Sequence, residues 1–195
     1  MSKGGTTREA ILGTAVGRAC RVGLGGLTIG DLAGSLGMSK SGLYAHFGSK
    51  ESLQLAVLDQ ARREFTETVI RPALAAPRGE ERVRALFERW IACGLARAPG
   101  GYLFVKASME LDEQDGLVRD QLARDHRDLY ATVATVFRTG VATGQFRADA
   151  DPDQFAADLD GVMLAFYHWH RLLDDKLAPV RARRGFEALL RAARP

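Results

Sequence analysis

The chain has 195 residues, of which 46% are hydrophobic and 26% charged, as expected for a globular domain with a sizeable core. It contains no apolar run of the length needed to span a membrane, and its N-terminus lacks the apolar centre of a signal peptide. Secreted and membrane-spanning proteins are therefore disfavoured, and we expect a cytoplasmic protein. The two cysteines are too few for a disulfide framework and lack the spacing of a metal site.

The net charge of +3 is unevenly distributed. Residues 1–50 carry six basic and two acidic side chains, a net charge of +4, so the rest of the chain sums to −1. A basic excess in one segment is what a phosphate-binding surface requires, although an excess of this size is weak evidence alone.

Apolar residues recur at helical spacing along the chain, and glycines, prolines and capping residues separate the helices. Residues 1–5 are small and polar and should form an arm, and Pro72 and Pro77 should end the fourth helix. The helices are expected over residues 7–22, 28–35, 39–45, 49–69, 80–97, 102–111, 116–142, 152–173 and 179–193. No stretch shows the alternation of a strand, so the sequence predicts an all-α fold of about nine helices.

Residues 28–53 carry the strongest local signals. Thr28 and Asp31 fit a capping box at a helix start, and Gly37 suits the end of that short helix. Ser39 is a natural N-cap for the next helix, and Gly48 should close it. Two short helices joined by a glycine-containing turn predict a helix-turn-helix, whose second helix has the size to enter a DNA major groove.

This stretch closely resembles the DNA-binding motif of the tetracycline-repressor (TetR) family of bacterial regulators. The matching residues are Thr28, Asp31-Leu32-Ala33, Gly37, Ser39-Lys40, Leu43-Tyr44, His46-Phe47 and Lys50-Glu51, with residues 7–12 and Gly23 fitting the family's first helix. The resemblance implies a three-helix DNA-binding domain over residues 1–50 and a helical ligand-binding and dimerisation domain over residues 51–195. The helix expected over residues 49–70 would link the two.

In the second short helix, Leu43 and Phe47 should face inward, while the opposite face is polar or small. Gly42 and Ala45 would permit close approach to base edges, and Ala45 could touch a thymine methyl group. The predicted DNA-binding residues are Thr28, Ser39, Lys40, Ser41, Gly42, Tyr44, Ala45, His46 and Lys50.

The roles of these residues differ. Lys40 and Ser41 can donate hydrogen bonds to bases or phosphates, and Tyr44 and His46 resemble the family's phosphate-contacting pair. Thr28 and Lys50 lie at helix N-termini, which favour phosphate binding, so that most of these contacts position the protein rather than specify a sequence. The alternatives are a half-buried aromatic ring for Tyr44, an exposed polar residue for His46, and a helix cap or solvated charge for Thr28 and Lys50.

The resemblance also implies a homodimer, held by a four-helix interface from the last two long helices of each subunit. Apolar stripes there supply candidates, which are Phe155, Leu159, Val162, Phe166, Phe186, Leu189 and Leu190. The alternative is that these stripes face the subunit's own core. A helix that is apolar over more than half its circumference can do both.

A small-molecule pocket is the third implication of the resemblance. Its candidate lining residues are Trp90, Cys93, Phe104, Met109, Phe137, Met163, Tyr167 and His168. Such a lining suits an apolar or aromatic effector, although ordinary core packing is the alternative for each residue. His168 and His170 point about 200° apart on a helix, so no metal site is expected there, and no cofactor is indicated.

The sequence therefore predicts a DNA-binding regulator, in the form of a homodimeric repressor that a ligand releases from a pseudo-palindromic operator. The direction of the response rests on the family. The alternatives are a helical small-molecule-binding or adaptor protein that binds no DNA and, least favoured, an enzyme. No GxSxG, P-loop, HExxH or Rossmann signature supports catalysis.

Overall fold

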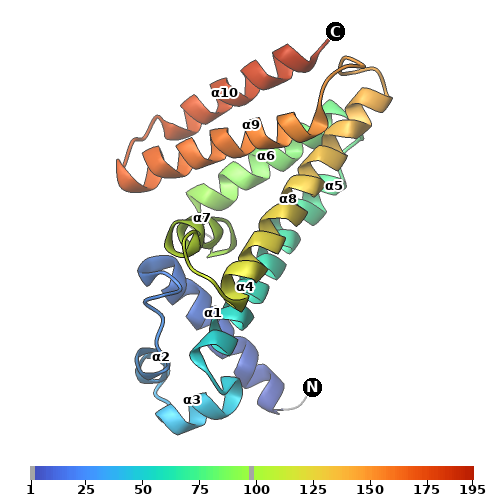
Figure 1. Cartoon of the computed structure of the whole chain (residues 1–195). Coiled ribbons are helices and arrows are strands. Elements are labelled where there is room, and N and C mark those ends of the chain that lie inside the picture. The colour runs from blue at the N-terminus through green and yellow to red at the C-terminus, as the bar shows by residue number, and fades with distance from the viewer. Residues whose placement is uncertain (1–2, 97–98) are drawn as a thin grey trace. The chain divides into compact units, whose positions relative to one another are not determined.

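The structure, a computed structural model, describes residues 3–96 and 99–195 and contains no strand in these ranges, which confirms the predicted all-α class (Figure 1). Helices lie at all nine expected positions. They are α1 (Lys3–Val22), α2 (Ile29–Ser35), α3 (Lys40–Phe47), α4 (Lys50–Phe65), α6 (Glu80–Leu95), α7 (Pro99–Leu111), α8 (Leu117–Ala142), α9 (Pro152–Tyr167) and α10 (Ala178–Ala193). Within the described ranges, no helix has both the length and the apolar character needed to cross a lipid bilayer.

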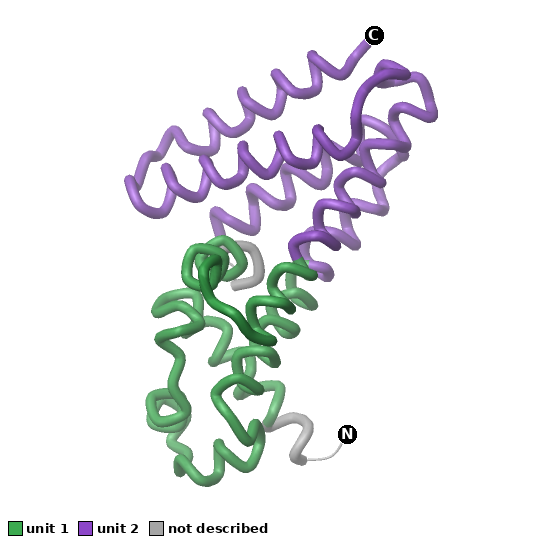
Figure 2. The backbone as a smooth tube through the Cα atoms, in the orientation of Figure 1, with its two compact units in different colours: residues 1–65, 97–125 green, residues 66–96, 126–195 purple. Residues whose placement is uncertain are grey.

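The chain forms two compact units (Figure 2). Unit 1 comprises Met1–Phe65 and Arg97–Asp125, and unit 2 comprises Thr66–Ala96 and His126–Pro195. Helix α7 and the first part of α8 thus belong to the same unit as α1–α4. The functional division at residue 50 stays a prediction.

Unit 1 encloses one continuous apolar core. Its residues come from the four N-terminal helices, from the α1–α2 connection, and from α7 and the start of α8. The buried members are Ile11, Leu12, Ala15, Val16, Ala19, Cys20, Leu24, Leu27, Leu32, Ala33, Leu43, Phe47, Leu53, Val57, Leu58, Ala61, Leu103, Ala107, Leu111, Val118 and Leu122. Burial of this set against water is the main force that holds α2 and α3 in place, because such short helices are marginal on their own.

Unit 2 is built around stacked aromatic rings. Phe137 stacks on Phe146 and on Phe155, with ring centroids 4.4 and 4.1 Å apart. Phe87 of α6 stacks on Phe186 of α10 at 4.0 Å. Burial and ring contacts of this kind fix α6, α8, α9 and α10 around a common core.

Ion pairs add to the contact between α6 and α10. The Arg84 guanidinium pairs with the carboxylates of Glu187 and Glu80, and Glu80 also pairs with Arg194. These partners lower the pKa of both carboxyl groups, chiefly through the hydrogen bonds from Arg194 to Glu80 and from Arg84 to Glu187. The pairs are partly exposed, so their contribution to stability is modest.

One helix boundary was predicted wrongly. Pro72 does not end the fourth helix, because helical conformation continues through a π-helical turn, η1 (Thr66–Ile70), into α5 (Arg71–Leu74). Proline lacks an N–H and crowds the preceding turn of an α-helix. The wide π turn before it avoids that conflict, and Pro72 then occupies the first turn of α5.

Two other boundaries shift. Helix α1 begins at Lys3, so the expected arm over residues 1–5 falls partly within a helix and partly on residues 1–2, outside the described residues. The helix expected over 152–173 ends as a π turn, η2 (His168–Leu172). At its start, Asp151 accepts the N–H groups of Asp153 and Gln154 at 2.9 and 3.2 Å, which confirms the predicted cap.

Candidate DNA-binding interface

Helices α2 and α3 form the predicted helix-turn-helix, and the capping residues act as expected at both starts. The Thr28 hydroxyl accepts the N–H of Asp31 at 3.1 Å and donates to the Asp31 carboxylate at 2.8 Å. The Ser39 hydroxyl accepts the N–H of Gly42 at 3.0 Å. Gly37, in the turn, has a φ of 63°, which a residue with a side chain rarely adopts. Local hydrogen bonds therefore set the turn that positions α3.

Helix α3 has one buried face and one open face. Leu43 is fully buried and Phe47 is 7% exposed, which confirms that these two residues face inward. Tyr44 is 55% exposed, so part of its ring is open to solvent and part is covered, which the alternative of a half-buried ring also describes. Of the other predicted contacts on this helix, Lys40, Ser41 and Ala45 are exposed, while Gly42 and His46 are partly exposed. The face that a DNA groove would meet is thus free of intramolecular packing over most of its length.

An open, largely apolar hollow lies on this face between α2 and α3. Ile29 and Gly30 line it from α2, and Lys40, Ser41, Tyr44 and Ala45 line it from α3. A Cβ atom at Gly30 would lie 3.1 Å from the Lys40 Cε atom. The glycine therefore leaves room for the lysine side chain to lie across the start of α2.

Gly42 has a role within the subunit that the sequence did not indicate. A Cβ atom there would lie 3.1 Å from the Ser39 hydroxyl oxygen, which caps the helix. A side chain at Gly42 would therefore crowd the hydroxyl group that caps the helix.

Two of the predicted phosphate contacts also hold the motif together. The Lys50 ammonium donates to the carbonyl of Gly25 at 2.6 Å, and two of its three N–H groups remain for other acceptors. Thr28 caps α2. The alternative of a helix cap thus holds for Thr28, but it does not exclude contact with a phosphate, because the residue is exposed.

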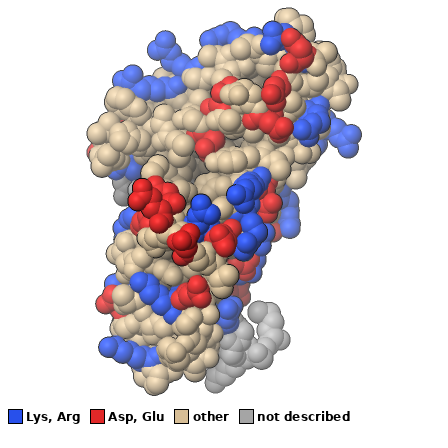
Figure 3. Space-filling view, in the orientation of Figure 1, with Lys and Arg blue, Asp and Glu red and all other residues tan. Residues whose placement is uncertain are grey.

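Sequence reasoning missed two contacts between α1 and the motif. The Arg18 guanidinium lies 3.6 Å from the Asp31 carboxylate, and the Arg8 guanidinium lies 5.3 Å from the centroid of the Phe47 ring. Their partners are 13 and 39 positions away along the chain, beyond the reach of a local pattern. On the face of the molecule shown in Figure 3, acidic and basic side chains are interspersed.

The predicted pocket residues are divided between the two units. Trp90, Cys93 and Tyr167 lie together in unit 2, where burial and then the Cys93 thiol raise the pKa of Tyr167 while a hydrogen bond with Trp90 lowers it. Phe137 belongs to the stacked rings, and Met163 is buried in the same unit.

The remaining predicted pocket residues are Phe104, Met109 and His168. Phe104 and Met109 belong to unit 1, and Met109 is 68% exposed. His168 is also exposed. Met109 and His168 are thus exposed in the single chain, and the expected pocket lining stays a prediction. In the described ranges, no cluster of three or more His, Cys, Asp or Glu side chains is placed to hold a metal ion.

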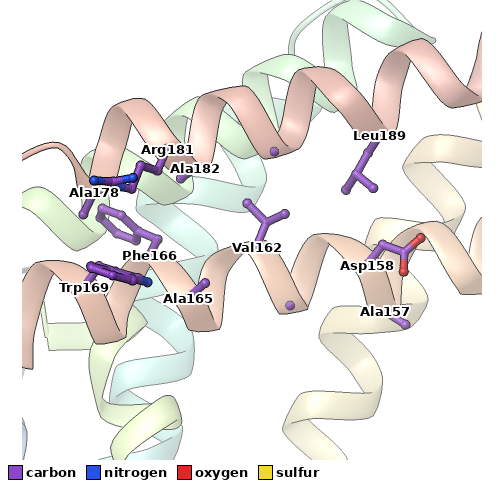
Figure 4. A pocket seen from close by; sticks show the side chains of 12 residues that line it. Ala157, Asp158, Val162, Ala165, Phe166, Trp169, Ala178, Arg181, Ala182 and Leu189 are labelled. Carbon is purple, nitrogen blue, oxygen red and sulfur yellow. The ribbon is translucent and has the colours of Figure 1, made fainter.

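The predicted dimer stripes mostly face the subunit's own core, as the alternative held. Five of their residues are at most 5% exposed, namely Phe155, Leu159, Phe166, Phe186 and Leu190. Val162 and Leu189 instead line an open groove between α9 and α10 (Figure 4). The single chain therefore buries most of the two stripes and leaves Val162 and Leu189 open, and the dimer interface stays a prediction.

The outer face of α9 in this groove is formed by small residues. Ala157, Gly161 and Ala165 follow one another at four-residue steps, and all three are exposed. At one end, the Arg181 guanidinium lies 5.3 Å from the centroid of the Trp169 ring (Figure 4). A surface of this kind allows another helix to approach closely.

The all-α fold and the exposed second helix of the helix-turn-helix define a DNA-binding protein of the helix-turn-helix class. Residues 11–57 match the family described as "Bacterial regulatory proteins, tetR family", and residues 79–186 match "Tetracyclin repressor-like, C-terminal domain". The second match alone covers more than half of the chain. The chain therefore belongs to the TetR family of transcriptional regulators.

Solved structures agree with this assignment. A TetR regulator from Chloroflexus aurantiacus J-10-FL is 26% identical, with 97% of this chain and 95% of that chain covered and a TM-score of 0.85. A TetR-family regulator from Cytophaga hutchinsonii is 17% identical over 100% and 98% of the two chains, with a TM-score of 0.87. AibR, solved with isovaleryl coenzyme A and operator DNA, is 23% identical over 96% and 98%, with a TM-score of 0.75. The last two show the fold alone, and a search of curated proteins gave no match.

Proposed function

We propose that this regulator is a cytoplasmic homodimeric repressor, which reads a pseudo-palindromic operator through α3 and leaves it when a small effector binds. The observation that carries the DNA-binding part is the exposed face of α3 behind its two buried anchors, Leu43 and Phe47. Because Leu43 and Phe47 already hold α3 in place, the stability of the motif does not require its open face of polar and small residues. That face is explained if it meets base edges and phosphates.

The proposed contacts divide by chemistry. Gly42 and Ala45 approach base edges, and Lys40 and Ser41 donate hydrogen bonds from the start of α3. Phosphates are held by Tyr44, His46 and Ser39, and by Thr28 and Lys50 at the N-terminal ends of α2 and α4.

A second copy of the chain is the proposed occupant of the groove between α9 and α10. Small residues along α9, with Gly185 and Leu189 on α10, let two copies of this helix pair pack as four helices. One helix-turn-helix reads few base pairs. A two-fold dimer doubles the site and places its half-sites about one DNA turn of roughly 34 Å, or a multiple of it, apart.

The proposed effector is a small apolar or aromatic molecule. The buried cluster of Trp90, Cys93 and Tyr167, with Met163 nearby in the same unit, supplies suitable surfaces. AibR, whose structure contains both a coenzyme A thioester and operator DNA, provides a precedent within the same fold. An effector that prefers the released state by about 1–3 kcal/mol would weaken operator binding by the same amount.

The test is a fluorescence-anisotropy titration of the purified protein against DNA flanking its own gene, at two salt concentrations. We expect tight binding with two subunits per pseudo-palindrome, and at least about tenfold weaker binding by Tyr44→Ala. Met109→Ala is the matched control, because it removes a large exposed side chain of the same unit outside the interface. Salt-sensitive binding that is equal on random DNA, or unaffected by Tyr44→Ala, would contradict the proposal.

A further inference from the structure

The connection between α1 and α2 is held by charged side chains from other helices of unit 1. The Glu110 carboxylate of α7 accepts the N–H of Gly25 at 3.1 Å. The Lys106 ammonium, one turn earlier on α7, donates to the carbonyl of Arg21 at 2.5 Å. Lys50 of α4 donates to the carbonyl of Gly25 at 2.6 Å. Both polar groups of the Gly25 backbone are therefore bound by ionic side chains.

The loop is shaped to receive the carboxylate. Gly23 has a φ of 85°, and a Cβ atom there would lie 1.7 Å from a Glu110 carboxylate oxygen. Glu110 thus occupies the space that a side chain at Gly23 would fill. On either side of Gly25, Leu24 and Leu27 are fully buried in the core of unit 1. The loop is therefore held both by its buried leucine side chains and by hydrogen bonds to its backbone.

Lys106 acts on the last turn of α1. Carbonyl groups at a helix C-terminus lack partners within the helix and carry the negative end of its dipole. An ammonium group at the Arg21 carbonyl satisfies one of them. Glu110 and Lys106, separated by one helical turn, thus hold the end of α1 and the loop that leads to α2.

We propose that Glu110 and Lys106 are positioning residues for operator binding, a role that rests on the proposed function. They fix the path from α1 to Thr28, the N-cap of α2, and through α2 they set the placement of α3. Helix α7 lies within the C-terminal family match over residues 79–186, yet it packs with α1 and α4 in unit 1. Two side chains of the C-terminal family region therefore complete the DNA-binding unit.

The direction in which operator affinity changes when Glu110 is removed distinguishes a positioning role from electrostatic repulsion of DNA. Removing an acidic side chain near DNA normally strengthens binding, because repulsion between the protein and the phosphates falls. If Glu110 positions the loop, its removal weakens operator binding instead. Glu113, an exposed acid three residues further along the chain, is the matched control for the charge.

The experiment measures operator affinity of the full chain at fixed salt for Glu110→Ala, Glu110→Gln and Glu113→Ala. We expect Glu110→Ala to bind the operator about fivefold more weakly than wild type. Glu110→Gln should keep an affinity within about twofold of wild type, because its amide oxygen still accepts the Gly25 N–H. Glu113→Ala should bind as tightly as wild type or more tightly. Binding by Glu110→Ala as tight as wild type or tighter would overturn the proposal. Equal losses for the glutamine and alanine variants would overturn it too.

Hydrogen exchange of the Gly25 amide, followed by NMR, provides a readout that does not depend on DNA. We expect protection in the wild type and in Glu110→Gln, and fast exchange in Glu110→Ala. An unprotected Gly25 amide in the wild type would overturn the proposal even if the alanine variant did not fold. If the wild-type protein binds operator DNA no more tightly than random DNA, the proposed function and this role are both refuted. If the wild type binds its operator tightly and Glu110→Ala binds equally well, only this role is refuted.

Discussion

Replacing Leu43 with alanine should destabilise unit 1 without a comparable effect on unit 2. Leu43 is fully buried in the core of unit 1, to which the short helix α3 contributes only one other residue, Phe47. Truncating a fully buried leucine costs about 3 kcal/mol, from lost burial and from the cavity left behind. That is a large part of the roughly 5–15 kcal/mol by which a typical domain is stable. Ala45→Gly, on the exposed face of α3, creates no cavity and should cost only about 1 kcal/mol.

The positions of the tryptophans make this prediction measurable. Both tryptophans of the chain, Trp90 and Trp169, lie in unit 2. In a urea titration, circular dichroism reports helices of both units, whereas tryptophan fluorescence reports unit 2. We expect Leu43→Ala to lower the midpoint of part of the circular-dichroism transition and to leave the fluorescence transition in place. A loss below about 1 kcal/mol would refute the burial argument, and equal shifts of both signals would refute the independence of the two cores.

Three further predictions concern unit 2. Gly161→Leu should be a monomer in sedimentation experiments and should lose operator affinity. It should keep its stability, because nothing lies within 4 Å of a Cβ atom there. A stable dimer would contradict the proposed interface. Gly94→Ala should lower the free energy of unfolding by about 1–2 kcal/mol in urea titrations. Its methyl group would lie 2.5 Å from the buried Phe166 ring, and this overpacking outweighs the gain in helix propensity. An unchanged stability would show that the ring can move. Arg84 lowers the pKa of Glu187, so the stability this pair provides is present above the ordinary value of 4.5 and lost as the pH falls through the lowered pKa. The deficit of Arg84→Met should therefore shrink in acid, and a deficit independent of pH would exclude this ion pair as its cause.

The helix-turn-helix could be predicted from the sequence because its determinants are local. Thr28 and Ser39 each cap a helix through the N–H three residues further on, and Gly37 supplies a backbone conformation with positive φ. Leu43 and Phe47, one turn apart, identify the buried face of α3. Each signal lies within a few residues of its effect, so the motif could be placed and α3 oriented without the rest of the fold.

Features that depend on distant residues could not be predicted in this way. Glu110 meets the Gly25 backbone across 85 positions, and nothing in either local pattern indicates the other. Phe155 and Leu159 form an apolar stripe that is buried in the single chain, but periodicity does not say whether such a stripe meets its own subunit or another copy. Pro72 is a local signal for the end of a helix, but helical conformation continues past it because a π turn precedes it.

The small residues along α9 also bear on which chains can assemble. Ala157, Gly161 and Ala165 leave room for a neighbouring backbone only if the facing helix is equally free of large side chains. A related regulator with leucine or phenylalanine at the corresponding positions would be held away, and its packing against this surface would leave voids. If two copies pack through this groove as proposed, the fit would favour self-association over mixed pairs, and this selectivity would keep related regulators from exchanging subunits.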